Sequence, residues 1–256
     1  MDLFSLEGKN IAITGASSGF GHHFAGVLSK AGANVILGAR RIDKINQRVS
    51  EIEKTGARAI ALSLDVRDSE SCREFLVQGE QALGSIDVLV NNAGVEAGAK
   101  TYAMIDEDDW DNVFDTNLKS VWRLSKLYTE LLQSSAQPQG NIINIASITA
   151  YRTIKGQFPY AVSKAALVKA TEIMGLEAAR FNIRVNALAP GYILTDVSRL
   201  LLEGDRSESF VKGIPMRRYG EFDDLDGPLL LLASDGSKYM TGSVIVIDGG
   251  HLCAEL

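Results

Sequence analysis

The sequence contains few of the residues that build disulfide frameworks or metal sites. Among its 256 residues are two cysteines and three histidines, and none of them shows metal-ligand spacing. We therefore expect no metal site. The first residues lack the basic and then apolar layout of a secretory signal, and no apolar run approaches the roughly 20 residues that span a membrane. A cytoplasmic location is expected.

Clusters of positive charge are also absent. The net charge is -6, the isoelectric point is about 5.2, and no run of Lys or Arg forms the basic stripe expected of a nucleic-acid-binding protein. Hydrophobic residues make up 46% of the chain and charged residues 23%, which is typical of a globular protein with a full core. We therefore expect a small-molecule ligand and neither nucleic acid nor membrane as a partner.

The first motif is a glycine-rich turn between a strand predicted at 10–14 and a helix predicted to end at residue 31. Glycines in such a turn let the backbone approach a pyrophosphate, whose charge is stabilised at the helix N-terminus. An ordinary strand-to-helix turn is the alternative. The predicted cofactor contacts in this loop are Gly15, Ser17, Ser18, Gly19, Phe20 and Gly21.

The end of the second predicted strand, 34–38, favours NADP over NAD. An acidic residue about 20 residues after the glycine loop binds the 2′-hydroxyl of NAD, whereas an arginine accommodates the 2′-phosphate of NADP. Here Ala39 is followed by Arg40 and Arg41. We predict that Arg40, supported by Arg41, binds the phosphate; the alternative is a pair of solvated arginines at the start of a helix.

Strands and helices alternate along the rest of the chain, which predicts right-handed crossovers and a parallel sheet. Further strands are predicted at 57–64, 87–91, 141–146, 183–189 and 243–248, and helices at 42–55, 68–83, 110–133, 159–177 and 222–233. We expect one α/β Rossmann domain over 1–256, with a doubly wound seven-stranded sheet and helices on both faces. The irregular stretch at about 192–218 is typical of a substrate lid. Four acidic residues at 106–109 are interpreted as a helix cap rather than a metal site.

A tyrosine and a lysine begin the helix predicted at 159–177. Tyr160 and Lys164 are four residues apart and therefore share a helical face. A phenol ordinarily has a pKa of about 10. An ammonium group one turn away favours the phenolate, so we expect a lowered pKa for Tyr160. Such a phenol can give a proton to a carbonyl or take one from an alcohol. Ser147, at the end of the strand 141–146, could stabilise charge on the reacting oxygen.

Together these motifs resemble the single-domain short-chain dehydrogenases/reductases, including the 3-oxoacyl reductase-like members. The likeness extends from residue 6 to residue 250. It rests on Thr14-Gly15-x-x-x-Gly19-x-Gly21, Asn91-Asn92-Ala93-Gly94, Asn117, Ser147, Tyr160-x-x-x-Lys164 and Pro190-Gly191. Each motif alone is weak, but six in this order are very specific.

The resemblance implies a role for each matching residue. Tyr160 is expected to be the general acid in reduction and the base in oxidation. Lys164 is expected to hold the nicotinamide ribose, Ser147 the substrate oxygen and Asn117 a water molecule. Further cofactor contacts are expected from Asp65, Val66, Asn91, Ala93, Gly94, Pro190, Gly191, Ile193 and Thr195. The resemblance also implies a homotetramer built on the helices predicted at 110–133 and 159–177 and on the C-terminal segment.

The chain departs from the family pattern in and after the glycine loop. Phe20 stands where an aliphatic residue is usual, and Ser18 stands where many NADP-dependent members carry a basic residue. The preference for NADP therefore depends on Arg40. His22 and His23 follow the glycine loop and are expected at the solvated surface.

The substrate is not determined by the sequence. Members of the fatty-acid branch reduce 3-oxoacyl groups on an acidic carrier protein. The loop at 133–140 has no Lys or Arg, and Arg180 is the one basic residue near the expected docking position, which argues against carrier binding. The expected pocket segments, 96–101, 149–158 and 192–215, contain apolar groups together with Arg152 and Lys155. An oxo acid, a sugar-like polyol and a small ring ketone all remain possible.

The predicted function is NADPH-dependent hydride transfer between nicotinamide and a carbonyl or secondary alcohol. An NAD-linked alcohol or polyol dehydrogenase is the first alternative. A non-catalytic dinucleotide-binding sensor is the second. Such relatives typically lose the tyrosine or the lysine, so the presence of Tyr160 and Lys164 favours an enzyme.

Overall fold

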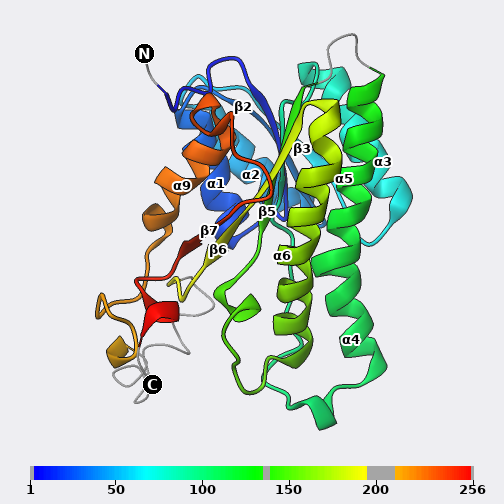
Figure 1. The fold of residues 1–256 in the computed structure, drawn as a ribbon. Coiled ribbons are helices and arrows are strands. Elements are labelled where there is room, and N and C mark those ends of the chain that lie inside the picture. The colour runs from blue at the N-terminus through cyan, green and yellow to red at the C-terminus, as the bar shows by residue number, and fades with distance from the viewer. Residues whose placement is uncertain (1–2, 135–138, 195–210, 255–256) are drawn as a thin grey trace.

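The computed structural model describes residues 3–134, 139–194 and 211–254. Within them, seven strands form one parallel sheet in the order β3-β2-β1-β4-β5-β6-β7 (Figure 1). The strands are β1 (Asn10–Thr14), β2 (Asn34–Ala39), β3 (Ala59–Ser63), β4 (Val88–Asn91), β5 (Gly140–Ile145), β6 (Ile183–Pro190) and β7 (Val244–Ile247). The predicted doubly wound Rossmann fold is confirmed.

Helices cover both faces of the sheet (Figure 1). They are α1 (Gly19–Lys30), α2 (Ile42–Glu53), α3 (Ser69–Leu83), α4 (Glu107–Phe114), α5 (Ser120–Gln133), α6 (Phe158–Ala178) and α9 (Asp226–Ala233). Helix α1 packs against α2 and α9, while α3 packs against α5 and α4 against α6. Because both faces are covered, β1, β4 and β5 are buried along their whole length, as apolar strands of a parallel sheet should be. None of the helices within the described ranges is long and apolar enough to cross a membrane.

Local signals in the sequence explain where several helices begin. The Asp68 side chain accepts a 2.8 Å hydrogen bond from the backbone N–H of Ser71 and caps α3. Asp106 caps α4 in the same way, through the N–H of Asp109 at 2.7 Å. The interpretation of the acidic run as a helix cap is thereby confirmed. Pro159 lies in the first turn of α6, where its missing N–H costs no hydrogen bond.

The helix predicted at 110–133 differs from the structure in two respects. It begins earlier, at Glu107, and a π-helical turn at Asp115–Lys119 separates α4 from α5. Such turns frequently occur at functional sites, and this one contains Asn117. The helix predicted at 222–233 begins instead as a 3-10 turn, Phe222–Leu225, before α9. Other boundaries differ from the prediction by one or two residues, as element ends commonly do.

The order of the strands determines where a ligand can bind. Strand β1 lies between β2 and β4, so the chain direction across the sheet reverses beside β1. In open parallel sheets, ligands bind outside the carboxyl ends of the strands at this reversal. The glycine loop, the arginines after β2 and the Asn91 to Gly94 motif all follow strands at this edge.

Candidate active site

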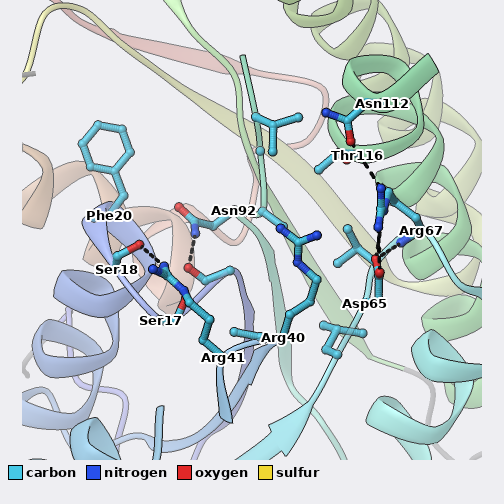
Figure 2. Close-up of a pocket in the computed structure, with 18 residues that line it drawn as sticks. Ser17, Ser18, Phe20, Arg40, Arg41, Asp65, Arg67, Asn92, Asn112 and Thr116 are labelled. Carbon is cyan, nitrogen blue, oxygen red and sulfur yellow. Dashed lines mark hydrogen bonds and ion pairs between the residues drawn. The ribbon is translucent and has the colours of Figure 1, made fainter. Parts of the chain in front are cut away.

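A cavity of about 440 Å³ occupies this edge of the sheet (Figure 2). Its walls come from the segments after β1, β2, β3 and β4, together with Asn112 and Thr116 from α4 and the π-helical turn. Predicted cofactor residues that line it are Gly15, Ser17, Ser18, Gly19, Phe20, Arg40, Arg41, Asp65, Val66, Ala93 and Gly94. The structure therefore brings together eleven residues that were chosen from four separate segments.

The glycines of the first loop let the backbone pass close to neighbouring segments. A Cβ added to Gly15 would lie 2.8 Å from Cα of Ala93, and one added to Gly21 would lie 2.6 Å from the carbonyl oxygen of Gly15. Both distances are too short for a side chain. Gly19 has φ of +57°, which L-residues rarely adopt, at the first turn of α1. The chain thus passes close to its neighbours and leaves its backbone N–H groups and the N-terminus of α1 available to a pyrophosphate.

The two arginines after β2 occupy different parts of the cavity. Arg41 reaches the glycine loop, where its guanidinium donates to the hydroxyl of Ser17 at 2.8 Å and to that of Ser18 at 2.7 Å. Figure 2 shows Arg41 directed at this loop and Arg40 extending between Asn92 and Asp65. Arg41 therefore places positive charge beside Ser17 and Ser18. Ser18 is the position at which many NADP-dependent members of the family carry a basic residue.

The cavity also contains the carboxylate of Asp65, which follows β3. The prediction of cofactor preference considered only the end of β2. Asp65 pairs with Arg67, with 3.1 Å between the carboxylate and the guanidinium. The hydrogen bond from Arg67 is the main cause of the lowered pKa of Asp65, and the charges of Arg67 and Arg40 contribute further. Three guanidinium groups, those of Arg40, Arg41 and Arg67, thus line the cavity together with one carboxylate that is already paired.

The Asn91-Asn92-Ala93-Gly94 motif divides into structural and cavity-lining residues. The Asn91 side chain is buried and donates to Oδ1 of Asn144 at 2.9 Å and to Ser125 at 3.3 Å. This side chain is therefore engaged within the core, and the expected cofactor contact of Asn91 stays a prediction. Asn92 holds the glycine loop instead, by donating to the carbonyl of Thr14 at 2.9 Å.

The predicted catalytic residues lie next to one another beyond Gly94. Ser147 follows β5, is buried, and is close enough to Tyr160 to lower the pKa of its phenol. Lys164 is buried on α6, and its Nζ donates to the carbonyl of Ile145 at 2.6 Å. A Cβ added to Gly94, which lines the cavity, would lie 3.8 Å from Nζ of Lys164. The cavity and the tyrosine–lysine pair are therefore parts of one site.

The expected lowering of the Tyr160 pKa is wrong for this structure. The pKa is raised to about 12: burial is the main cause, the negative charge of Glu96 contributes, and Ser147 only partly offsets these two effects. Lys164 is not among the groups that shift this pKa. Its Nζ lies 5.6 Å from the centre of the Tyr160 ring, and burial lowers its own pKa to about 8. Tyr160 is thus a protonated phenol at neutral pH, suited to donate a proton.

Asn117 uses its side chain to hold the segment after β4. Its Oδ1 accepts from the N–H of Val95 at 2.8 Å, and its Nδ2 donates to the carbonyl of Val95 at 2.9 Å and to Ser163 at 3.2 Å. These contacts occupy both donor hydrogens. The predicted contact with a water molecule stays a prediction, whereas the positioning of Val95 is evident in the geometry.

The remaining predicted residues follow β6. Pro190 ends that strand, the N–H of Gly191 donates to Ile247 at 2.8 Å, and Ile193 forms a bridge with Gly220. These three do not line the cavity after β1 to β4. Thr195 and residues 196–210 of the expected lid lie outside the described residues. Only the two ends of that lid, at 192–194 and 211–218, can be placed.

Two aromatic side chains in and after the glycine loop, those of Phe20 and His23, pack against Phe222. Phe20 stacks on Phe24, with ring centres 5.9 Å apart, and meets the edge of Phe222 at 5.8 Å, so it repacks the wall between α1 and the start of α9. His23 is partly buried, stacks on Phe222 and approaches the Asp226 carboxylate at 2.7 Å. The expected surface position of His23 is therefore wrong, because its partners come from a segment about 200 residues later.

Three residues of the site were not singled out from the sequence. Arg67 and Asn112 line the cavity and are joined by a 3.3 Å hydrogen bond, and Glu96 is close enough to influence the pKa of Tyr160. Arg67 and Glu96 lie on turns that follow strands at the ligand-binding edge, so their position could have identified them. Asn112 belongs to a helix, and nothing in the local sequence distinguishes it.

Sequence and structure comparisons agree with this description. A family model described as enoyl-(acyl carrier protein) reductase matches residues 15–251. The chain is 38% identical to a 3-oxoacyl-[acyl-carrier-protein] reductase of Thermotoga maritima, over 96% of this chain and 98% of the relative. It is 34% identical to the 5-keto-D-gluconate 5-reductase of Escherichia coli, over 99% of both chains. A gluconate 5-dehydrogenase from Burkholderia cenocepacia, solved with NADP and tartrate, superposes with a TM-score of 0.93 at 31% identity, over 99% of both chains.

The fold and the site define a dinucleotide-binding oxidoreductase with a Rossmann fold. The comparisons specify this class further: the chain belongs to the short-chain dehydrogenase/reductase family. Members of this family bind NAD or NADP, and the chain is an enzyme that acts on CH–OH and C=O groups.

Proposed function

We propose that this enzyme is an NADPH-dependent carbonyl reductase that can also run as an alcohol dehydrogenase. One observation carries the proposal: Ser147, Tyr160 and Lys164 meet beside Gly94, which also lines the cofactor cavity. A proton donor, a second hydrogen-bond donor and a cation are therefore available where a carbonyl would meet the nicotinamide. The reductases from T. maritima and E. coli, which match over nearly the whole chain, support this reaction class.

Each residue of the catalytic group has a distinct part in the reaction. When bound, the nicotinamide supplies the hydride to the carbonyl carbon. The Tyr160 hydroxyl donates its proton to the carbonyl oxygen, and the Ser147 hydroxyl stabilises the negative charge that develops on that oxygen. The ammonium of Lys164 lies behind the phenol and favours its ionised form after the proton has left. Asn117 acts indirectly, by fixing Val95 beside this group.

The preference for NADPH is supported by the charges of the cavity. Arg41 already binds the hydroxyls of Ser17 and Ser18, and Arg40 extends into the same cavity. Guanidinium groups bind phosphate through two parallel hydrogen bonds. The enzyme of B. cenocepacia that was solved with NADP supports the same preference. An NAD-linked polyol dehydrogenase would need a carboxylate at the end of β2 to bind the ribose, and this chain has Ala39 and Arg40 there.

Oxidation of NADPH and of NADH by the purified protein, measured across a panel of ketones, tests this function. We expect turnover with NADPH to exceed turnover with NADH for at least one ketone. The rate with each ketone separates the enzyme from the sensor hypothesis, because a sensor would bind the cofactor tightly and oxidise none of it. Faster turnover with NADH would contradict the proposed role of the arginines.

The raised pKa of Tyr160 predicts a pH profile. Reduction needs the protonated phenol, so kcat/KM for reduction should hold through neutral pH and fall as the phenol ionises in the alkaline range. The negative charge of Glu96 contributes to the raised pKa. In Glu96→Gln the pKa of Tyr160 should drop, and the alkaline fall should move to lower pH. Glu53→Gln, at an exposed position on α2, is the matched control and should leave the profile unchanged. An unshifted profile in Glu96→Gln would contradict the assignment of the titrating group to Tyr160.

We also propose that the enzyme is a cytoplasmic homotetramer. Trp122 on α5 is 55% exposed and Leu176 on α6 is 80% exposed, and a cavity of about 740 Å³ lies between these helices. Apolar side chains so exposed are typical of a surface that another chain covers. Docking of an acidic carrier protein is not supported, because Arg180 is accompanied by Glu130 and Glu177 in the same cavity.

Light scattering tests the tetramer. The wild-type protein should have about four times the mass of one chain, and Leu176→Glu should shift it to a smaller species, because a charge would be buried without a partner. Val77→Glu, the same kind of change on α3, is the control and should leave the mass unchanged. A wild-type monomer would overturn this proposal.

A further inference from the structure

A second cavity lies on the substrate side of the site, after the segment that carries Ser147. It has a volume of about 380 Å³, and its walls include Arg152, Lys155, Tyr192 and His251. Two of these side chains are cations, and no carboxylate is among the described residues that line the cavity. A cavity with this lining favours an anion over a neutral or positively charged group.

Arg152 is held firmly in this cavity. Its backbone N–H donates to the carbonyl of Ile148 at 2.9 Å, within the turn that follows Ser147. Its guanidinium donates to the carbonyl of His251 at 2.8 Å through Nη1. A guanidinium has five N–H donors, so one bond to a carbonyl leaves others for a ligand. His251 is buried as well, and its Nδ1 has no hydrogen-bond partner within the described part of the chain.

A side chain of opposite charge, Glu96, belongs to the segment after β4. Glu96 follows Val95, which Asn117 fixes by two hydrogen bonds, and a few residues later Lys100 forms a bridge with Gln157 just before α6. The segment that carries Glu96 is therefore held at both ends along the start of the catalytic helix. Glu96 influences the pKa of Tyr160, Lys164 and Tyr192, which places its charge beside the catalytic group.

Tyr192 connects the two charged regions. It lines the cavity with Arg152, its ring lies 5.5 Å from that of His251, and both Arg152 and Glu96 influence the pKa of its phenol. Tyr192 is thus close both to Glu96 and to the cations of the second cavity. An anionic group is attracted by Arg152 and Lys155 and repelled by Glu96.

Building on the proposed carbonyl reduction, we propose that the substrate is an oxo acid whose carboxylate binds Arg152 and Lys155 while a carbonyl several bonds away meets Tyr160. Glu96 disfavours 2-oxo acids, because their carboxylate is attached directly to the reacting carbonyl and would lie beside it. Of the oxo acid, polyol and ring ketone that the sequence left open, the charges of the pocket select the first. The reduction is balanced: hydride from NADPH bonds to the carbonyl carbon, the Tyr160 proton bonds to its oxygen, and solvent returns that proton to Tyr160.

Straight-chain oxo acids and their primary amides test this inference. The probes are pyruvate, 4-oxopentanoate, 5-oxohexanoate and 6-oxoheptanoate, each with its amide, assayed with NADPH. The measured quantity is the ratio of kcat/KM for the acid to that for the amide at each chain length. Both members of a pair use the same cofactor and proton donor, so the ratio reports only the binding of the carboxylate.

We expect a ratio of about 10 to 100 at the best of the longer chain lengths, as for a hydrogen bond to a charged group, and a ratio below one for pyruvate. Arg152→Gln should bring the high ratio close to one, and Arg152→Lys should restore part of it. Lys155→Gln, at an exposed position where folding is not at risk, should lower it less. Lys54→Gln, an exposed lysine at the end of α2, should have no effect. Glu96→Gln should raise the ratio for pyruvate.

Three results would overturn the inference. The first is a ratio near one at every chain length in the wild-type enzyme. The second is a high ratio that Arg152→Gln and Lys155→Gln leave unchanged. Either of these, with turnover of the neutral amides intact, would refute the carboxylate site and leave the reductase function standing. The third, no turnover of any ketone with NADPH or NADH, would overturn the proposed function and this inference together.

Discussion

Tyr160→Phe should lower kcat for carbonyl reduction by about 10²- to 10⁴-fold, the range that a positioned general acid contributes. The Tyr160 phenol is the group to which the proposed mechanism assigns proton donation, and the Ser147 hydroxyl alone can stabilise the developing charge without supplying a proton of suitable acidity. The affinity for NADPH should change little, because the cofactor cavity is lined by residues after β1 to β4 and not by this hydroxyl. Turnover and cofactor binding should therefore separate.

The matched control for this substitution is Tyr239→Phe. Tyr239 is fully exposed, so the same loss of a hydroxyl should leave both kcat and NADPH affinity unchanged. Steady-state kinetics and fluorescence titration with NADPH measure the two quantities. A Tyr160→Phe enzyme that keeps more than about one tenth of its kcat would mean that another group donates the proton, since a general acid is worth more than that.

Replacing both arginines after β2 should remove the preference for NADPH. In Arg40→Gln/Arg41→Gln, kcat/KM with NADPH should fall by about 10²-fold or more, because hydrogen bonds to charged groups contribute about 1.5–3 kcal/mol each. Turnover with NADH, which has no 2′-phosphate, should change much less. Each single variant separates the two contributions, and Arg41→Gln should show the larger loss if the bonds to Ser17 and Ser18 orient it for phosphate.

Arg73→Gln is the control for the arginine variants. Arg73 is exposed on α3 and does not line the cavity, so the ratio of NADPH to NADH turnover should stay at the wild-type value. Raising the salt concentration should weaken NADPH binding more in the wild-type enzyme than in the double variant, because exposed charge pairs are screened. If the double variant still prefers NADPH, another cation must bind the 2′-phosphate, and Arg67, which also lines the cavity, would be tested first.

The fold could be predicted because local patterns and the layered architecture agree. Short apolar runs alternate with amphipathic segments, and a parallel sheet covered on both faces requires that pattern. The edge of the sheet that binds the ligand follows from the same pattern, so residues as distant as Gly15 and Gly94 could be assigned to one site. The π-helical turn around Asn117 could not be predicted, because its sequence continues the helical pattern on either side.

The electrostatics of the site depended on contacts that the sequence does not contain. The four-residue spacing of Tyr160 and Lys164 correctly predicted a shared helical face. It did not reveal that burial raises the pKa of Tyr160 and lowers that of Lys164. Nor did it reveal that the charge of Glu96 adds to the rise in the Tyr160 pKa. The same limit applies to Arg41 and to His23, whose partners became evident only in the folded chain.

Transfer of deuterium from NADPH labelled at C4 of the nicotinamide ring tests the central claim most directly. The enzyme would be incubated with the labelled cofactor and its best oxo acid or ketone, and the alcohol product analysed by mass spectrometry and NMR. The account predicts one deuterium on the carbinol carbon from one face of the cofactor, and no labelled product from Tyr160→Phe within the same time. An alcohol without deuterium, or labelled product formed equally fast by the variant, would contradict it.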